Sequence, residues 1–250
     1  MGLSMQRNLP EIVFASADKA ESQRISRWVR SGTLRRLVPR IYTSNKKDSD
    51  EAIVTRNLYL ILTKLFPGAV LSHRTALEGG PAKTGDLFLT YKYSRKVNLP
   101  GFSVHLLKGP GPVEGDMPFL RGLFMSSRAR AFLENLQISR SRSSIAKVLS
   151  RADIEERLDC ICQIQGADAL NQLRDDARTI ALSLHMEDPF QKLNKIISAI
   201  LRTRPARELA SPQARATSLG VPYDPQRLEI FNRLFAYLTQ SQLPMRKESG

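Results

Sequence analysis

Apolar side chains recur at helical spacing near the start of the chain. Ile25, Trp28 and Val29 stand at i, i+3 and i+4, with polar and basic residues around them. This stripe is typical of an amphipathic helix that buries one face. We therefore predict a helix over residues 20–31 whose core side is this stripe, with Asp18 as its N-cap and a glycine directly after its end.

A hairpin is predicted immediately after this helix. Apolar residues flank a Val38-Pro39-Arg40 step within residues 33–43, a pattern of two short strands joined by a tight turn. Leu34 is assigned to the same core as the helix stripe. Because a helix followed at once by a basic hairpin has the sequence form of a winged helix, residues 1–47 are predicted to form a winged-helix-like unit.

Residues 48–138 show mixed periodicity. A strongly apolar helix is predicted over 52–66, closed by Pro67-Gly68, and helical spacing returns at 125–136. Between these helices lie short apolar runs separated by glycine and proline. The mixture predicts a small mixed α/β domain. Its expected strands are 69–71, 87–89, 97–99 and 104–107, with a short helix near 75–77.

The rest of the chain has apolar residues at helical spacing, and two segments interrupt this pattern. Residues 139–147 are basic and serine-rich, which is typical of a linker. Residues 203–222, rich in Arg, Ala, Ser and Pro, form a second break. The fold class is therefore predicted as α+β, with a helical region over 139–203 and a linker with a terminal helix over 204–250. The expected helices are 154–164, 167–185, 190–201 and 225–239.

The composition is strongly basic, and the charge is uneven. The 250 residues have a formal net charge of +14 and a pI near 10.2. Ten basic and three acidic residues fall within positions 1–47, so this segment carries half of the net charge. A basic surface indicates partners such as nucleic acid or an anionic membrane. No apolar run has the ~18 residues that a membrane span needs, and no signal-peptide core is found, so we expect a bacterial-type cytoplasmic protein without a membrane partner.

The predicted helix and hairpin supply the candidate binding residues. In helix-turn-helix proteins one helix reads base edges in the major groove, while flanking cations bind phosphates. We expect groove contacts from the helix and phosphate contacts from the hairpin of double-stranded DNA. A solvated basic face of an ordinary small domain is the alternative. The candidate DNA-binding residues are Gln23, Ser26, Arg27 and Arg30 on the helix, and Arg35, Arg36 and Arg40 on the hairpin.

Few residues could carry catalysis. Cys160 and Cys162 point to different faces of a predicted helix, which argues against a disulfide or zinc site. Ser72 and His73 are adjacent, and adjacent side chains usually point apart. Ser72 is therefore predicted to cap the following helix rather than to act as a nucleophile. Neither of the other two histidines has a partner at metal-ligand spacing.

Other motifs also fail to define an enzyme. The Gly-Pro run at 108–112 does not match a phosphate-binding loop, because its prolines remove backbone N–H donors. Adjacent carboxylates on the predicted helices are typical of solvated surface. A metal-dependent nuclease in the α/β domain stays as an alternative, with Asp86 or Glu78 as the residues it would need. We expect no enzyme, no cofactor and no metal.

Three segments occur in an order known from one protein family. They are residues 32–37 with 40–42 (GTLRRL, RIY), 71–77 (LSHRTAL) and 127–134 (SRARAFLE). Over about 15–138 the chain resembles the AbiE-type (abortive infection) type IV antitoxin and transcriptional regulator family. The resemblance implies an N-terminal winged helix with a second α/β domain, repression of the chain's own promoter, and opposition to a cognate toxin. The seven candidate residues above are the positions that carry over.

The chain departs from that family in two places. Val38-Pro39 stands at the wing tip, where glycine is commoner, which implies a stiffer tip with different phosphate contacts. The segment 9–18 before the predicted helix is short for two complete helices of a standard winged domain. The resemblance therefore implies an abbreviated DNA-binding unit.

A second resemblance concerns the C-terminal half. Residues 182–185 with 188–190, and then 193–197, are similar to the stretch that precedes the catalytic domain in long Fic (cell filamentation) proteins. The Fic catalytic motif, His-Pro-Phe-x-x-Gly-Asn-Gly-Arg, is absent from the 250 residues. The alternative function is thus a regulatory module of a Fic-type adenylyltransferase, standing alone or truncated before its enzyme, with a Fic-type catalytic domain as partner. The sequence leaves the oligomeric state open.

Overall fold

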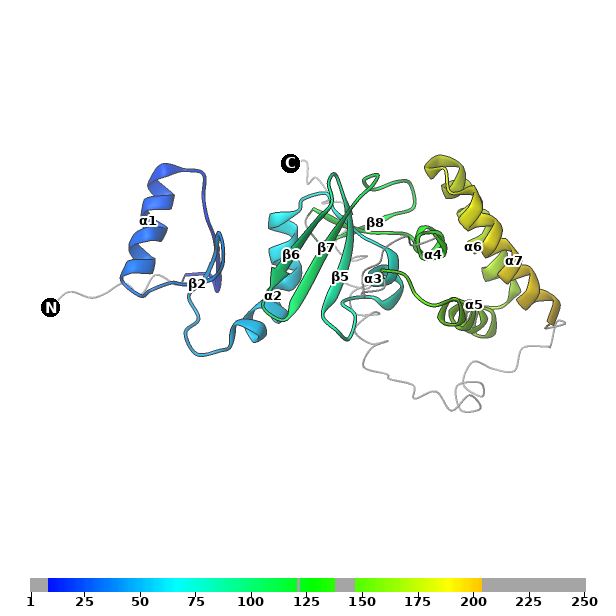
Figure 1. Cartoon of the computed structure of the whole chain (residues 1–250), viewed down its shortest axis with the longest axis horizontal. Helices are drawn as coiled ribbons and strands as arrows, with labels where there is room; N and C mark the ends of the chain where they lie inside the picture. Colours follow the sequence, from blue (N-terminus) through cyan, green and yellow to red (C-terminus); the bar gives the residue numbers. More distant parts are fainter. Residues whose placement is uncertain (1–8, 121, 138–146, 204–250) are drawn as a thin grey trace, which may run out of the picture. The chain divides into compact units, whose positions relative to one another are not determined.

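A computed structural model describes residues 9–120, 122–137 and 147–203. In this part the fold is mixed α/β, with seven helices and two sheets (Figure 1), which confirms the predicted mixture of helices and strands. Most of the predicted linker and the whole of the predicted helix over 225–239 lie outside the described residues. Within the described ranges no helix combines the length and apolar character needed to cross a bilayer.

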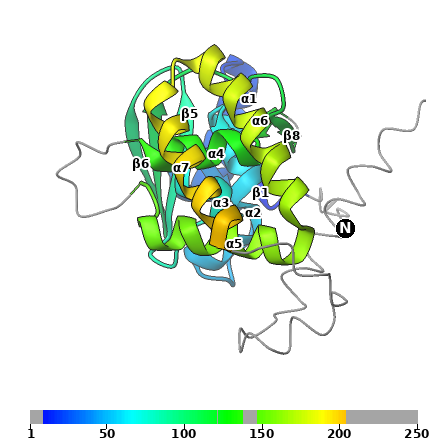
Figure 2. The ribbon, with the colours of Figure 1, turned by 90° about the vertical axis from the view of Figure 1, so that its right-hand side faces the viewer.

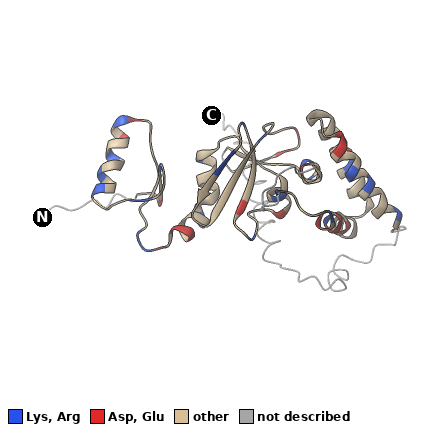
Figure 3. Cartoon of the chain, in the orientation of Figure 1, with Lys and Arg blue, Asp and Glu red and all other residues tan. Residues whose placement is uncertain are grey.

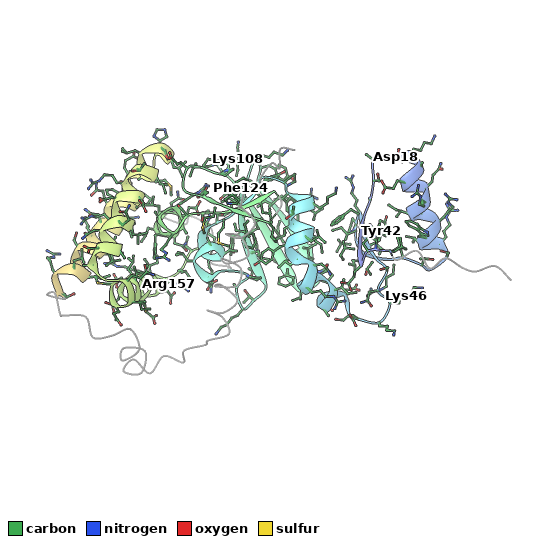
Figure 4. All side chains as sticks on the ribbon, turned by 180° about the vertical axis from the view of Figure 1, so that it is seen from behind. Asp18, Tyr42, Lys46, Lys108, Phe124 and Arg157 are labelled. Atoms are coloured by element: carbon green, nitrogen blue, oxygen red, sulfur yellow. The ribbon has the colours of Figure 1, made fainter. Side chains whose placement is uncertain are left out.

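The N-terminal unit consists of one helix and a three-stranded antiparallel sheet of order β1-β3-β2. Helix α1 begins after Asp18, whose Oδ1 accepts a hydrogen bond from the Glu21 N–H at 2.7 Å, so the predicted helix and its cap are confirmed. The predicted hairpin is also confirmed. Figure 4 labels Asp18 and, on the hairpin, Tyr42. The bounds are β1 Ile12–Phe14, α1 Lys19–Arg30, β2 Arg35–Val38 and β3 Ile41–Thr43.

Two details of this unit differ from the prediction. Strand β1, which pairs with β3, occupies the segment that was judged short for two helices, so a single described helix precedes the hairpin. The stripe on α1 is also narrower than predicted. Ile25 and Leu34 are buried, but Val29 is 36% exposed and is not a core residue.

Helix α2 (Asp50–Leu65) is the long apolar helix expected from the sequence. Ser49 caps it, since its Oγ accepts from the Ala52 N–H at 3.2 Å. One apolar cluster includes Ile41 of the hairpin, Ile53 of α2 and strand residues of the larger sheet. The same helix therefore packs against apolar residues of both sheets.

The larger sheet has six strands in the order β6-β7-β5-β4-β9-β8. Pairs β4–β9 and β5–β7 are parallel, and the other neighbours are antiparallel. The four predicted strands are confirmed, but β8 and β9 were missed, and Met125 ends β9 rather than beginning a helix. Strands of three residues, one containing Pro118, are too short to show a period. The bounds are β4 Val70–Leu71, β5 Asp86–Tyr91, β6 Arg95–Leu99, β7 Phe102–Lys108, β8 Met117–Phe119 and β9 Leu123–Met125.

Five helices complete the unit that ends at Thr203. Helices α4 to α7 share a second apolar cluster, which includes Phe132 of α4, Leu158 of α5 and Leu193 of α7. Helices α6 and α7 pack side by side, as Figures 1 and 2 show. The bounds are α3 His73–Glu78, α4 Arg128–Leu136, α5 Arg151–Gln165, α6 Ala167–Leu184 and α7 Glu187–Thr203.

Candidate nucleic-acid interface

One side of α1 is exposed, polar and basic. At 100° per residue, the positions opposite Ile25 and Trp28 carry side chains that are all exposed. Apart from Ala20, which shares this side, none is apolar and none is acidic. Figure 3 shows the Lys and Arg positions along the helix. We call this set the α1 face; it consists of Lys19, Gln23, Ser26, Arg27 and Arg30.

The α1 face contains the four helix residues predicted from the sequence and one that was missed. Lys19 was missed because it begins the helix, outside the expected bounds. Arg24 is also exposed and lies on the flank of the face. The Ser26 hydroxyl donates to the Ser22 carbonyl at 3.0 Å, so its oxygen remains an acceptor at the surface. The face therefore offers several donors and at least one acceptor.

The helix dipole accounts for only part of this charge. Arg27 and Arg30 lie in the last turn, where cations stabilise a helix. Lys19 lies in the first turn, where a cation is unfavourable. Local helix stability therefore explains the two arginines but not the lysine.

The hairpin presents two exposed arginines. Arg36 lies on β2 opposite Tyr42, and Arg40 lies in the turn with φ of 70°. The Arg40 carbonyl accepts a hydrogen bond from the Ala15 N–H at 2.8 Å, which holds the turn against the chain before α1. A left-handed φ costs a non-glycine residue about 1–2 kcal/mol. The chain thus carries an arginine in a backbone conformation that favours glycine.

Arg35 has a different place from the other six predicted residues. Its Nε donates to the Asn45 carbonyl at 2.9 Å, its NH2 donates to the Asp48 carbonyl at 2.8 Å, and its NH1 forms an ion pair with Asp50. These contacts tie β2 to the connector and to the first residue of α2. The guanidinium that was expected to contact phosphate is bound within the chain.

A second network ties Glu11, the residue before β1, to α2. The Arg56 Nε donates to the Glu11 carboxylate at 2.8 Å, and the Asn45 and Asn57 amides donate to the same carboxylate at 2.9 and 2.8 Å. These bonds, that from Arg56 foremost, lower the pKa of Glu11 to about 2. Asp48 also pairs with Arg56. Polar contacts from β2 and from the residue before β1 therefore reach α2 or the connector before it.

The structure also brings Ser72 and His73 together, contrary to the prediction. The His73 Nδ1 lies 3.1 Å from the Ser72 Oγ, which is 2.8 Å from the Thr90 Oγ1. Ser72 occupies the N-cap position of α3, but its side chain makes no cap hydrogen bond. The left-handed φ of 53° at His73 turns the ring back toward the serine. The approach of the two side chains was not predicted, because adjacency in the sequence carries no information on the backbone φ of His73.

This pair is not arranged for catalysis. Ser72 is fully buried and His73 is 6% exposed, so no substrate reaches the hydroxyl in this conformation. Burial, helped by the positive charges of Lys147 and Arg130, lowers the pKa of His73 to about 3. A histidine with so low a pKa is neutral at pH 7 and is a weak base.

A buried ion network lies next to this pair. Arg130 is fully buried and pairs with Asp116 and with Glu134, whose Oε1 accepts from its Nε at 2.8 Å. Its remaining donors reach the carbonyls of Gly111 and Pro110 at 3.0 and 3.1 Å. The network fixes the Gly-Pro run against α4.

Glu134 links this network to α3. Its Oε2 accepts from the His73 backbone N–H at 2.8 Å, and burial raises the pKa of its carboxyl. Two segments far apart in the sequence, 71–77 and 127–134, therefore meet at one place. The Arg–Glu spacing of i,i+4 on a helix with apolar neighbours was the sequence signal of a buried pair.

The carboxylates considered for a nuclease are occupied by other partners. Asp86 accepts from the Thr84 Oγ1 at 2.6 Å and lies 2.8 Å from the His105 Nε2. Glu78 pairs with Arg74 on α3 at 2.7 Å. Among the described residues no group of three or more His, Cys, Asp or Glu side chains could hold a metal ion.

Comparison of the chain with family models, curated proteins and solved structures finds no match.

Proposed function

We propose that this chain is a DNA-binding transcriptional regulator, and that the α1 face and the hairpin arginines Arg36 and Arg40 form its contact with double-stranded DNA. The observation that carries the proposal is the exposed, acid-free α1 face beside a basic hairpin. Lys19 and Arg40 strengthen it, because each occupies a position that local stability disfavours. Such residues are explained by a partner with dense negative charge.

The proposed mode is that of an abbreviated winged helix. Helix α1 lies in the major groove, where arginine pairs with guanine O6 and N7 and glutamine with adenine N6 and N7. Gln23, Arg27 and Arg30 have these functional groups, and Ser26 adds a shorter donor and acceptor. Arg36 and Arg40 contact phosphates beside the groove, where they add affinity but no sequence preference.

Arg35 has a supporting part in this proposal. Its contacts with Asn45, Asp48 and Asp50 hold β2 in place, so it positions the hairpin rather than binding phosphate. This assignment removes Arg35 from the seven predicted DNA contacts and adds Lys19, so the proposed set again has seven residues.

Substitution within the α1 face tests the proposal. The double substitution Arg27→Gln with Arg30→Gln removes two exposed cations without changing the buried side of α1. We expect at least about a tenfold loss of duplex affinity, since each specific arginine–base contact contributes about 1–3 kcal/mol. Lys83→Gln, which removes one exposed lysine from the turn before β5, is the control and should bind as the parent does. Equal affinity of the double variant and the control would contradict the proposal.

The antitoxin part of the proposal rests on the resemblance to AbiE-type regulators. It predicts that the chain represses its own promoter and opposes a toxin encoded beside it. Co-expression of the neighbouring gene with and without this chain tests this part. Growth arrest that the chain relieves supports it, and arrest that the chain leaves unchanged contradicts it.

A further inference from the structure

A hollow of about 400 Å³ lies between α6 and α7. One lining residue comes from α6, and the others come from positions on α7 that recur at intervals of three and four residues, so they form one stripe along that helix. We call it the α6–α7 hollow. Its lining residues are Arg174, Asn194, Lys195, Ser198, Leu201 and Arg202.

The lining is positively charged. Three cations, Arg174, Lys195 and Arg202, meet there, and no carboxylate is among the described residues that line it. The acidic residues of α7 lie in its first turn, at Glu187 and Asp188. The carboxylates that follow Arg174 in the sequence of α6 do not line the hollow either. The charge in the hollow therefore has no compensating group in its own wall.

Arg174 is the most informative residue of the hollow. Its Nε is buried and donates to no acceptor within the described part of the chain. An unsatisfied buried donor is unfavourable, because it has lost its hydrogen bonds to water without gaining a protein partner. Arg178, one turn further along α6, differs, because its guanidinium lies 5.7 Å from the ring centre of Phe190. Arg174 thus lines a basic hollow with a donor that finds no acceptor in the described part of the chain, whereas the Arg178 guanidinium lies near an aromatic ring.

The neighbouring groups fit a tetrahedral anion. A guanidinium supplies two parallel N–H donors, and an ammonium adds a point charge. The Asn194 amide and the Ser198 hydroxyl are neutral donors beside them. Arg202 donates its Nε to the Ser198 carbonyl at 3.1 Å, which leaves its terminal nitrogens for a ligand. Three cations around one group suit a doubly charged phosphate better than a singly charged carboxylate.

We propose that the α6–α7 hollow is a phosphate-binding site, with Arg174 and Lys195 as its main ligands. The phosphate group comes either from a free phosphorylated molecule or from a nucleic-acid backbone, and the chemistry of recognition is the same for both. The inference does not depend on the α1 face, because the residues, helices and hydrogen bonds that carry it are different.

The Arg174 Nε–H provides a direct spectroscopic probe. Side-chain ¹H–¹⁵N spectra of the full chain are recorded while inorganic phosphate is added against sodium chloride of equal ionic strength. The Arg174 signal should move and saturate with phosphate but not with chloride. Lys195→Gln should raise the phosphate Kd at least tenfold, and Arg178→Gln should leave it unchanged. A second titration with adenosine monophosphate, and a third with a duplex of random sequence, separate the two sources.

Each outcome decides the proposal. A saturable response to phosphate or to the nucleotide supports a free ligand, and a response to the duplex alone supports a backbone contact. Movement of the Arg174 signal by none of the three, or equal movement with chloride, overturns the proposal. The same titrations on the Arg27→Gln, Arg30→Gln variant keep the two proposals apart: phosphate binding should persist there even when duplex binding through α1 is lost.

Discussion

Arg40 shows most clearly how a single residue is held against its local preference. Its backbone is left-handed, with φ of 70°, and it directly follows Val38-Pro39, the wing tip where the resemblance makes glycine commoner. The expectation of a stiff tip came from Val38-Pro39, but the strain lies at the following residue. Periodicity carries no information on the sign of φ, so the sequence alone did not predict this feature.

The substitution Arg40→Gly separates stability from binding. Glycine adopts a positive φ without strain, so the free energy of unfolding should rise by up to about 1 kcal/mol, the strain being partly offset by the greater entropy of glycine in the unfolded chain. Duplex affinity should fall, because a phosphate contact is lost. Urea unfolding and anisotropy measure the two effects. Arg36→Gln is the control that loses charge without relieving strain; a less stable Arg40→Gly protein would contradict this account.

His73 makes the stability of the fold depend on pH. Its folded pKa of about 3 lies below the ordinary value of 6.5, so the folded state binds fewer protons than the unfolded state below pH 6.5. The stability that depends on neutral His73 is therefore fully present above pH 6.5, and it is lost as the pH falls toward 3. The loss should be about 1.4 kcal/mol per pH unit in this window. The raised pKa of Glu134 acts in the opposite sense, and the lowered pKa of Glu11 acts only below about pH 4.5.

Urea unfolding of the parent and of His73→Asn between pH 7 and pH 5 tests this dependence. Asparagine tolerates a left-handed φ and does not titrate, so the variant should lose less stability than the parent as the pH falls. The difference between the two proteins isolates the histidine from the carboxylates. Parallel curves over the window would show that His73 does not carry the effect.

At the scale of elements, the sequence predicted the helices and strands that a hydrophobic pattern and flanking turn residues define. Helices α1 and α2, the hairpin and the four strands β4 to β7 follow from periodicity and from glycine or proline at their ends. Strands β1, β8 and β9 were missed because three residues do not define a period. Contacts between elements could not be predicted from the hydrophobic pattern either. The hydrogen bond from the backbone N–H of His73 on α3 to Glu134 on α4 is an example.

The buried Arg130 is predicted to be essential for joining these elements. Arg130→Met should lower the free energy of unfolding by about 3–5 kcal/mol, because it leaves the buried Asp116 and Glu134 without their cation. Methionine keeps much of the volume, so packing loss is small. The exposed Arg151 of α5, paired with Glu155 on the surface, is the matched control, and Arg151→Met should change stability by less than about 1 kcal/mol. Similar losses for the two variants would contradict a special role for Arg130.

Two arginines adjacent on β2 should behave differently on DNA. Arg36 is exposed and Arg35 is bound to the start of α2. Arg36→Gln should reduce the slope of log affinity against log salt by about one, as expected for the loss of one phosphate contact. Arg35→Gln should leave that slope unchanged and lower the unfolding free energy instead. Affinity measured from low to moderate salt distinguishes the two, and an equal change of slope would overturn the positioning role given to Arg35.

On the scale of the whole molecule, composition indicated a polyanionic partner but not where it binds. Half of the formal charge of +14 lies within residues 1–47 and pointed to the α1 face, whereas only the arrangement of elements singles out the α6–α7 hollow. The first was predictable, because its residues are close in the sequence and share one helix. The second was not, because Arg174 and the stripe on α7 come together only through the packing of two helices.

The central claim is that the α1 face gives this chain a sequence-selective contact with DNA. Its most direct test is a fluorescence-anisotropy titration of the full chain on its own upstream duplex and on a scrambled duplex, each at two salt concentrations. We expect tighter binding to the upstream duplex, and affinity for both duplexes that falls with salt because phosphates are neutralised. Equal and weak binding to both duplexes at low salt would contradict the claim. That result would favour a protein as the partner of the basic α1 face.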